Sequence, residues 1–305
     1  MIKSITVTNY LDDSITLELT RPEKSGFIVM DVEGLEPPKA DINMAEVSTN
    51  DGAVFNSARS TTRNVILYLN FYDGNPNESV EDIRHKSYKY FPTKQKVKLV
   101  IETDRRVSEI EGYVESNKPV IFDKQTGTQI SILCPYPYFY AHEEVTTTVF
   151  SGITPAFEFP FSNESLTDNL LEFGIIENAA EQVIVYNGDS EIGMTITIFA
   201  LGEATNITIH NVRTREQMKI DTDRLAELTG SGIVAGDQIT ISTVKGDKWV
   251  KLLRNGVEYN ILNCLSRDAD WFALSKGDNI FAYTAETGSS MLQFKIENRI
   301  VYEGV

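Results

Sequence analysis

Gln129-Ile130-Ser131-Ile132-Leu133-Cys134-Pro135-Tyr136-Pro137-Tyr138-Phe139-Tyr140 is the stretch of sequence that decides how the first half of the chain folds. Apolar and polar residues alternate at its start, which predicts a strand. The two prolines end that strand, because neither can donate to a ladder and each restricts the residue before it. The aromatic side chains around them predict a rigid, apolar corner. Such a corner is typical of the end of a domain.

Length and composition predict a soluble, mainly β protein. With 305 residues, the chain is long enough for two domains. Its 41% hydrophobic and 24% charged residues are ordinary for a globular protein, and its 13 Tyr and 15 Phe favour strands. No apolar run approaches the roughly 20 residues that span a membrane, so no membrane insertion is expected. The first residues also lack the apolar block of a signal peptide. We therefore expect the protein to stay where it is made, or to leave by lysis or within a particle.

Charge argues against nucleic acid as a partner. The formal net charge is −16, with −6 on residues 1–145 and −10 on residues 146–305, so both halves repel a phosphate backbone. One segment, Arg84 to Lys98, carries six Lys or Arg and no carboxylate. It is interpreted first as a solvated helix end and edge strand. The alternative is a basic surface for an acidic neighbour, with Lys94, Lys96 and Lys98 on one strand face.

The sequence contains no recognisable catalytic or cofactor-binding constellation. Its three His have no His or Cys at ligand spacing, and its two Cys lie 130 residues apart, which favours buried thiols. Phosphate-binding loops, dinucleotide fingerprints and nucleophile elbows are absent from the sequence. No catalytic, cofactor-binding or metal-ligating residue is therefore predicted, no cofactor is expected, and we expect a protein that is not an enzyme.

Two patterns leave alternatives open. Asp221-Thr222-Asp223 could contribute to a calcium site, but the pattern lacks the remaining oxygen ligands, so a turn at a strand end is favoured. Trp249 and Trp271 could form a sugar-stacking platform, but each lies in a strand-like stretch, which favours packing in the core.

Residues 1–140 are predicted to form a domain in which one helix lies across a largely antiparallel sheet. The nearly continuous apolar run Arg63–Phe71 predicts a central strand. The helix is expected to begin at Asn75 as its cap and to stop at Pro92, with Val80, Ile83, Ser87, Tyr90 and Phe91 on one face.

Residues 141–305 are predicted to be a connector followed by an all-β domain. Residues 141–180 lack clear periodicity and are interpreted as a connector with one strand at most. We expect the boundary between the two folding units within residues 141–160. Beyond the connector, short strands recur with turn signals at about the 8–12-residue spacing of a sandwich. Asn255-Gly256 is a strong hairpin signal.

The order of these patterns resembles the siphophage distal tail protein family, also called the Dit or baseplate hub family. The resemblance rests on a series of segments along nearly the whole chain: Arg63–Phe71, Arg84, Tyr90-Phe91, Val97-Lys98-Leu99, Gly112-Tyr113-Val114, Cys134-Pro135 through Phe139, Asn187-Gly188, Ile207-Thr208-Ile209, Ile220-Asp221-Thr222, Ser266 through Leu274, Gly277-Asp278-Asn279 and Tyr302-Glu303-Gly304-Val305. It implies an N-terminal β-sandwich with a helix and a projecting hairpin, and a galectin-like or carbohydrate-module-like second sandwich.

For function, the resemblance implies a structural protein of a phage or prophage-derived tail tip. Six copies would form a ring through the first domain. The ring would join the tail tube protein to the tail-tip hub or tail-associated lysin-type protein, and to receptor-binding proteins for host attachment. The expected location is the tail tip of the virion, and the host cytoplasm during assembly. The alternative is a carbohydrate-binding or glycan-active protein that uses the second sandwich.

Overall fold

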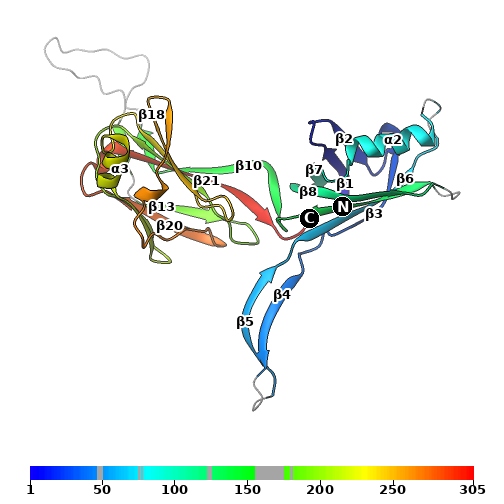
Figure 1. The fold of residues 1–305 in the computed structure, drawn as a ribbon, viewed down its shortest axis with the longest axis horizontal. Coiled ribbons are helices and arrows are strands. Elements are labelled where there is room, and N and C mark those ends of the chain that lie inside the picture. Colours follow the sequence, from blue (N-terminus) through cyan, green and yellow to red (C-terminus); the bar gives the residue numbers. More distant parts are fainter. Residues whose placement is uncertain (47–50, 75, 77, 122–125, 155–174, 179–180) are drawn as a thin grey trace, which may run out of the picture. The chain divides into compact units, whose positions relative to one another are not determined.

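The structure is a computed structural model that describes residues 1–46, 51–74, 76, 78–121, 126–154, 175–178 and 181–305. The chain divides into two compact units. The first comprises Met1–Glu144 together with Val301–Val305, and the second comprises Val145–Ile300. The chain passes between the units twice, within β10 (Phe139–Val149) and within β21 (Leu292–Tyr302). Figure 1 shows the path of the chain.

The first unit is built from antiparallel strands that share one long strand, β8 (Val107–Pro119). The remaining strands of its body are β1 (Ile2–Thr8), β2 (Ser14–Glu18), β3 (Phe27–Glu33), β6 (Arg63–Phe71), β7 (Lys96–Thr103) and β9 (Gly127–Cys134). One half of β8 pairs with β7, which continues to β1 and β2. The other half pairs with β9, which continues to β6 and β3. The ladder shifts register between Val114 and Ser116, and such a bulge lets one strand turn a sheet corner.

The core of this unit is filled by the alternating apolar residues that the sequence pattern predicts. In β6, every second residue from Arg63 to Phe71 is buried, and the residues between them are not. Val65, Leu67 and Leu69 pack in one cluster with buried side chains of β1, β7, β8 and β9. The side chains of Phe27 and Phe71 meet edge to face at 6.0 Å between ring centroids.

Two helices belong to the first unit: the single turn α1 (Pro22–Ser25) and the longer α2 (Val80–Tyr90). Helix α2 buries the predicted face, with Ile83, Ser87 and Phe91 inside. Its predicted start at Asn75 is wrong; Asn75 itself lies outside the described residues. The cap is Ser79, whose hydroxyl accepts a hydrogen bond from the Asp82 amide while Asp82 accepts one from the Ser79 amide. This reciprocal pair of bonds satisfies two helix-end donors, which an Asn cap further upstream would not.

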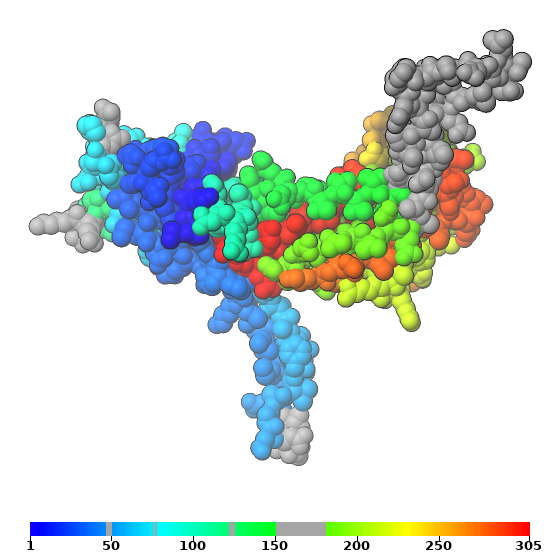
Figure 2. Space-filling view, turned by 180° about the vertical axis from the view of Figure 1, so that it is seen from behind, coloured from blue at the N-terminus to red at the C-terminus, as the bar shows by residue number. Residues whose placement is uncertain are grey.

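A two-stranded hairpin of β4 (Ala40–Glu46) and β5 (Ala53–Ser60) extends from the first unit. In Figures 1 and 2 it stands away from the body as a thin arm. Its strands pair with each other and with no other strand among the described residues. All residues of the two strands are exposed except Ser60, at the end next to the body, which is half-buried.

The second unit packs two antiparallel sheets against each other. One sheet has the order β19-β18-β17-β14-β21 and the other the order β13-β20-β15-β16. The new strands are β13 (Glu181–Tyr186), β14 (Thr195–Ala200), β15 (Ile207–Asn211), β16 (Glu216–Ile220), β17 (Gln238–Ser242), β18 (Trp249–Arg254), β19 (Val257–Asn260) and β20 (Gly277–Thr284). Tyr283 of β20 stacks on Phe294 of β21 at 3.8 Å between ring centroids, so aromatic side chains from both sheets form the core.

The expected mainly β fold class is confirmed, with one addition in the second unit. Helix α3 (Thr222–Thr229) begins where a turn was predicted. Asp221 is its cap, and its carboxylate accepts hydrogen bonds from the amides of Asp223 and Arg224. The Asp-Thr-Asp pattern is therefore a helix start, because the first helical amides need acceptors. Two short 3₁₀ turns, Leu262–Cys264 and Ser289–Met291, complete the unit.

The stretch 141–180, predicted as a connector with one strand at most, contains more strand structure than expected. Most of β10 lies here, followed by β11 (Ser151–Thr154) and β12 (Ile175–Asn178), which pair with each other. The prediction missed β10 because residues 143–147 are exposed on both faces of the strand, so no alternation marks them. Pro155 and Pro160, which motivated the connector, lie outside the described residues.

Candidate interaction site: the hairpin arm and its root

The hairpin arm has one apolar and one mainly polar face. The pairing register places Ile42 opposite Ala58 and Met44 opposite Phe55, with a bulge between Asn43 and Met44. Because successive side chains of a strand point to opposite faces, these four residues share one face. Their larger side chains remain exposed: 50% for Ile42, 56% for Met44 and 62% for Phe55. The arm therefore presents a strip of apolar side chains to solvent.

The opposite face of the arm is polar near the body, whereas nearer the tip it carries the pair Ala45 and Val54, with Val54 56% exposed. Asn43 pairs with Ser57 and Asp41 with Arg59 in the ladder. The Arg59 guanidinium donates to the Asp41 carboxylate, at 3.2 Å for both Nε and Nη2. An isolated two-stranded hairpin is only marginally stable in water. An exposed arm that is apolar on one face is consequently suited to being covered by another protein surface.

The root of the arm is fixed by a buried arginine. Arg63, at the start of β6, is only 4% exposed. Its Nη1 donates to the carbonyl oxygens of Gly34 at 2.5 Å and Glu36 at 2.6 Å, in the segment that leads into β4. Its Nε donates to the Pro137 carbonyl and its Nη2 to the Glu303 carbonyl, both at 2.6 Å. Burial lowers the pKa of this guanidinium from its ordinary value.

The aromatic residues around Pro135 and Pro137 form the other side of the arm root. The Arg63 guanidinium lies 4.6 Å from the ring centroid of Phe139. Tyr138 shares a hydrogen bond of 2.9 Å with the hydroxyl of Ser60, the last residue of β5. Tyr136 stacks on Tyr140 and meets Tyr138 edge to face, each at 5.3 Å between centroids. Ser60 shares the face of Ile42, so a row of half-buried tyrosines continues the apolar face of the arm onto the body.

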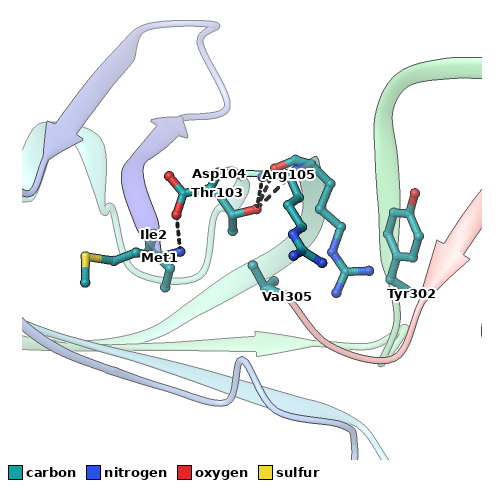
Figure 3. A pocket seen from close by; sticks show the side chains of 8 residues that line it. Met1, Ile2, Thr103, Asp104, Arg105, Tyr302 and Val305 are labelled. Carbon is teal, nitrogen blue, oxygen red and sulfur yellow. Dashed lines mark hydrogen bonds and ion pairs between the residues drawn. The ribbon is translucent and has the colours of Figure 1, made fainter.

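The C-terminal residues lie against the same root. The Val305 amide donates to the Leu35 carbonyl at 3.1 Å. Tyr302 and Val305 also line a shallow pocket beside the β7–β8 turn, shown in Figure 3. There the guanidinium of Arg106 lies 4.4 Å from the ring centroid of Tyr302. The arm root is thus assembled from three distant parts of the sequence: residues 34–36, 137–139 and 303–305.

The basic segment does not form the lysine face that the sequence predicts. Strand β7 starts at Lys96, and Lys94 precedes it with a left-handed φ of 68°, so the three lysines do not alternate along one strand. Lys96 lies 2.8 Å from Glu111 and Lys98 lies 2.8 Å from Glu109, both on the neighbouring β8. Much of the positive charge is therefore balanced within this chain. The predicted edge strand is wrong, because β7 pairs with β1 on one side and with β8 on the other. The ion pairs with β8 nevertheless weigh against a basic docking surface.

The interpretation of the two tryptophans as core residues is wrong. Trp249 and Trp271 are both partly exposed. A lysine ammonium lies 5.0 Å from each ring centroid, Lys251 over Trp249 and Lys248 over Trp271. These are cation–π contacts. On each tryptophan, a sugar that stacks on the ring face covered by the lysine would have to displace that lysine.

The two cysteines are buried thiols, as the sequence predicts. Cys134 and Cys264 are free and buried, and burial raises the pKa of the Cys134 thiol to about 12. A cluster of three or more metal-ligating side chains does not occur among the described residues. None of the helices described is long and apolar enough to cross a membrane. The part of the chain that the structure describes therefore offers a binding surface, the arm, more clearly than a chemical centre.

Sequence comparisons identify no relative of the chain. No protein-family model matches it, and the comparison with curated proteins finds no match.

Structural comparison gives a likeness along nearly the whole chain. The chain is similar to the SPP1 Dit protein (gp 19.1), which is described as a paradigm of the hub adsorption apparatus in phages that infect Gram-positive bacteria. The two share 13% sequence identity at a TM-score of 0.64, over 97% of this chain and 98% of that chain. A chain of the phage P2 baseplate in its activated conformation matches at 13% identity and a TM-score of 0.50, over 98% of both chains. The fold expected from the sequence resemblance is confirmed: along almost all of its length, the chain has the fold of the SPP1 Dit protein.

Proposed function

We propose that this protein is a structural component of a phage or prophage-derived tail tip. The observation that carries the proposal is the likeness to the SPP1 Dit protein, which extends over both units rather than over one common sandwich. A single β-sandwich is shared by many unrelated functions, whereas a match along the whole of both chains constrains function more strongly.

We further propose that six copies of the chain form a closed ring through the first unit. A ring requires a heterologous interface, in which one surface of each copy contacts a different surface of the next. The hairpin arm suits this role because its apolar face, with Ile42, Met44 and Phe55, is exposed in the single chain. An arm that reaches over a neighbouring copy would bury that face.

The ring would connect the tail tube protein to the tail-tip hub or lysin-type protein and carry receptor-binding proteins at its periphery. The protein would then reside at the tail tip of the virion, after assembly in the host cytoplasm. The proposed role needs no catalysis.

The two units are proposed to fold independently, the first building the ring and the second facing outward partners. Sugar binding by the second unit is a weaker candidate, since a lysine lies over each tryptophan ring.

Immunoelectron microscopy tests the proposed location. Antibodies raised against the purified chain are applied to phage particles induced from the source strain. We expect gold label at the tail end distal to the capsid, and none on particles from a strain in which the coding sequence is deleted. Label on the capsid, or particles that keep normal tail tips after the deletion, would contradict the proposal.

A further inference from the structure

The buried guanidinium of Arg63 has an unusual set of partners. It is satisfied by four backbone carbonyls, of Gly34, Glu36, Pro137 and Glu303. Among the described residues, no carboxylate lies within ion-pair distance of it. Burial lowers its pKa, whereas the carboxylates of Glu36 and Glu303, which lie further away, still favour its charged form. Burying a charge is costly, and an apolar side chain of similar size would often fill such a site at no loss of stability. What the guanidinium offers instead is geometry, because its planar fork holds several acceptors at fixed positions.

The positions it holds are the two places where the chain passes between the body and the arm, here called the crossings of the arm root. Gly34 and Glu36 lie where the chain leaves the body towards β4, and Arg63 itself lies three residues after β5 returns. Gly34 has a φ of +83°, and a Cβ there would lie 2.1 Å from the Asn64 carbonyl oxygen. The outgoing crossing is therefore pressed against the backbone beside Arg63. Both crossings are fixed to one side chain.

A fixed root matters because the arm is a lever. Seven residues of β4 at about 3.3 Å each make an arm about 23 Å long. A rotation of about 20° at the root moves the tip by about 8 Å, whereas the groups of a binding site generally have to be held within about 0.5 Å. The arm cannot meet a partner in register unless its direction is set.

The C-terminal segment, residues 303–305, holds the root from a second side. Besides the bond from Arg63 to the Glu303 carbonyl, the Val305 amide bonds to Leu35, between the two carbonyls that Arg63 holds. Gly304 fits closely: a Cβ there would lie 3.0 Å from the Leu35 carbonyl oxygen and 3.3 Å from Pro37 Cδ. A larger residue at this position would push the segment away from the root.

We propose that Arg63 and residues 303–305 form a two-part latch that sets the direction of the hairpin arm. Arg63 is a positioning residue in this latch, and displacement of residues 303–305 releases the arm. The latch itself does not depend on what the arm binds; only its consequence for ring assembly rests on the proposed function.

Distance measurement by pulsed electron paramagnetic resonance tests the latch in the full chain. Spin labels are attached to Ser57→Cys on the arm and Gln129→Cys on the body, both exposed positions. The native cysteines are buried, and the raised pKa of the Cys134 thiol disfavours the reactive thiolate, so they should not take up label. The distances are compared in the parent, Arg63→Lys and Gly304→Val. Arg254→Lys in the second unit is the matched control, because it also shortens a buried arginine.

We expect a narrow distance distribution in the parent and a broadened or shifted one in Arg63→Lys and in Gly304→Val. Arg254→Lys should lower the unfolding temperature and leave the distribution unchanged. Parent-like distributions in both latch variants would overturn the inference. Should Arg63→Lys fail to fold, Gly304→Val decides alone. If the latch variants move the arm but assemble like the parent, the latch stands and the proposed role of the arm in assembly fails.

Discussion

Replacing the apolar face of the arm should weaken self-assembly without unfolding the chain. The variant carries Ile42→Thr, Met44→Thr and Phe55→Thr. Threonine favours strands, so the arm should keep its conformation. The three side chains are 50%, 56% and 62% exposed in the single chain, so they contribute little to the packing of the body.

The size of the effect follows from the exposed fractions. Full burial of such a side chain stabilises by about 1.5–3 kcal/mol, so burying the exposed half is worth about 0.8–1.5 kcal/mol. Three side chains together contribute about 2.4–4.5 kcal/mol to each interface. Since about 1.4 kcal/mol corresponds to a tenfold change, association should weaken about 50- to 1,600-fold.

Mass photometry over a concentration series measures this effect, alongside circular dichroism and thermal unfolding. The matched control exchanges a cross-strand pair on the polar face, Asn43→Ser with Ser57→Asn, and should assemble like the parent. The reasoning is refuted if the threonine variant assembles at the same concentration as the parent, or if the polar-face exchange weakens assembly equally.

Three further predictions concern the stability of each unit and the boundary between the two units. Ser79→Ala should destabilise the first unit by about 1 kcal/mol, because it removes the cap of α2. Hydrogen bonds from Ser79 lower the pKa of Asp82, so the stability from this carboxylate is present above its unfolded pKa and is lost as pH falls through the folded one. Carboxyl titration by NMR should find that pKa raised towards its ordinary value in Ser79→Ala, and an unchanged pKa would contradict the pairing. Arg254→Met should cost about 3–5 kcal/mol, because it leaves the 1%-exposed Asp237 carboxylate without its bidentate partner. The chain's two tryptophans both lie in the second unit, so their fluorescence reports this loss, and an unshifted denaturation midpoint would count against it. Limited proteolysis should cut first within residues 141–160 and leave two resistant fragments, whereas early cleavage inside both halves argues against independent units.

The strands of the body could be predicted because one of their faces is buried. In β6 and β14, burial alternates residue by residue. The sequence of β14 begins with the same alternation, whereas β6 was predicted from its nearly continuous apolar run. Helix α3 was missed because Asp221 was interpreted as the end of a strand, and only eight residues follow before Gly230 ends the helix. Asp221 also begins a short helix, and a sequence pattern that fits both a turn and a cap does not distinguish them.

The arm was expected only from the family resemblance. The bulge in its ladder explains why the residue pattern alone did not predict it. Ile42 and Met44 keep the period of two on β4, but the bulge shifts Phe55 out of phase with Ala58 on β5. The apolar face is therefore visible only once the register is known. Burial of Arg63 could not be predicted from the sequence either, because arginine is rarely buried. Its partners here are backbone carbonyls that lie far apart in the chain. The lysines of β7 were misjudged for a similar reason, since their carboxylate partners lie diagonally across the ladder on β8.

Native mass spectrometry with negative-stain images tests the central claim, a closed ring of six copies, most directly. The account predicts a species of six times the 34.2 kDa chain and class averages with six-fold symmetry. The threonine variant of the arm should shift that species to the single chain at the same concentration. A chain that remains monomeric up to the highest soluble concentration, alone and in the presence of the tail tube protein, would contradict the account.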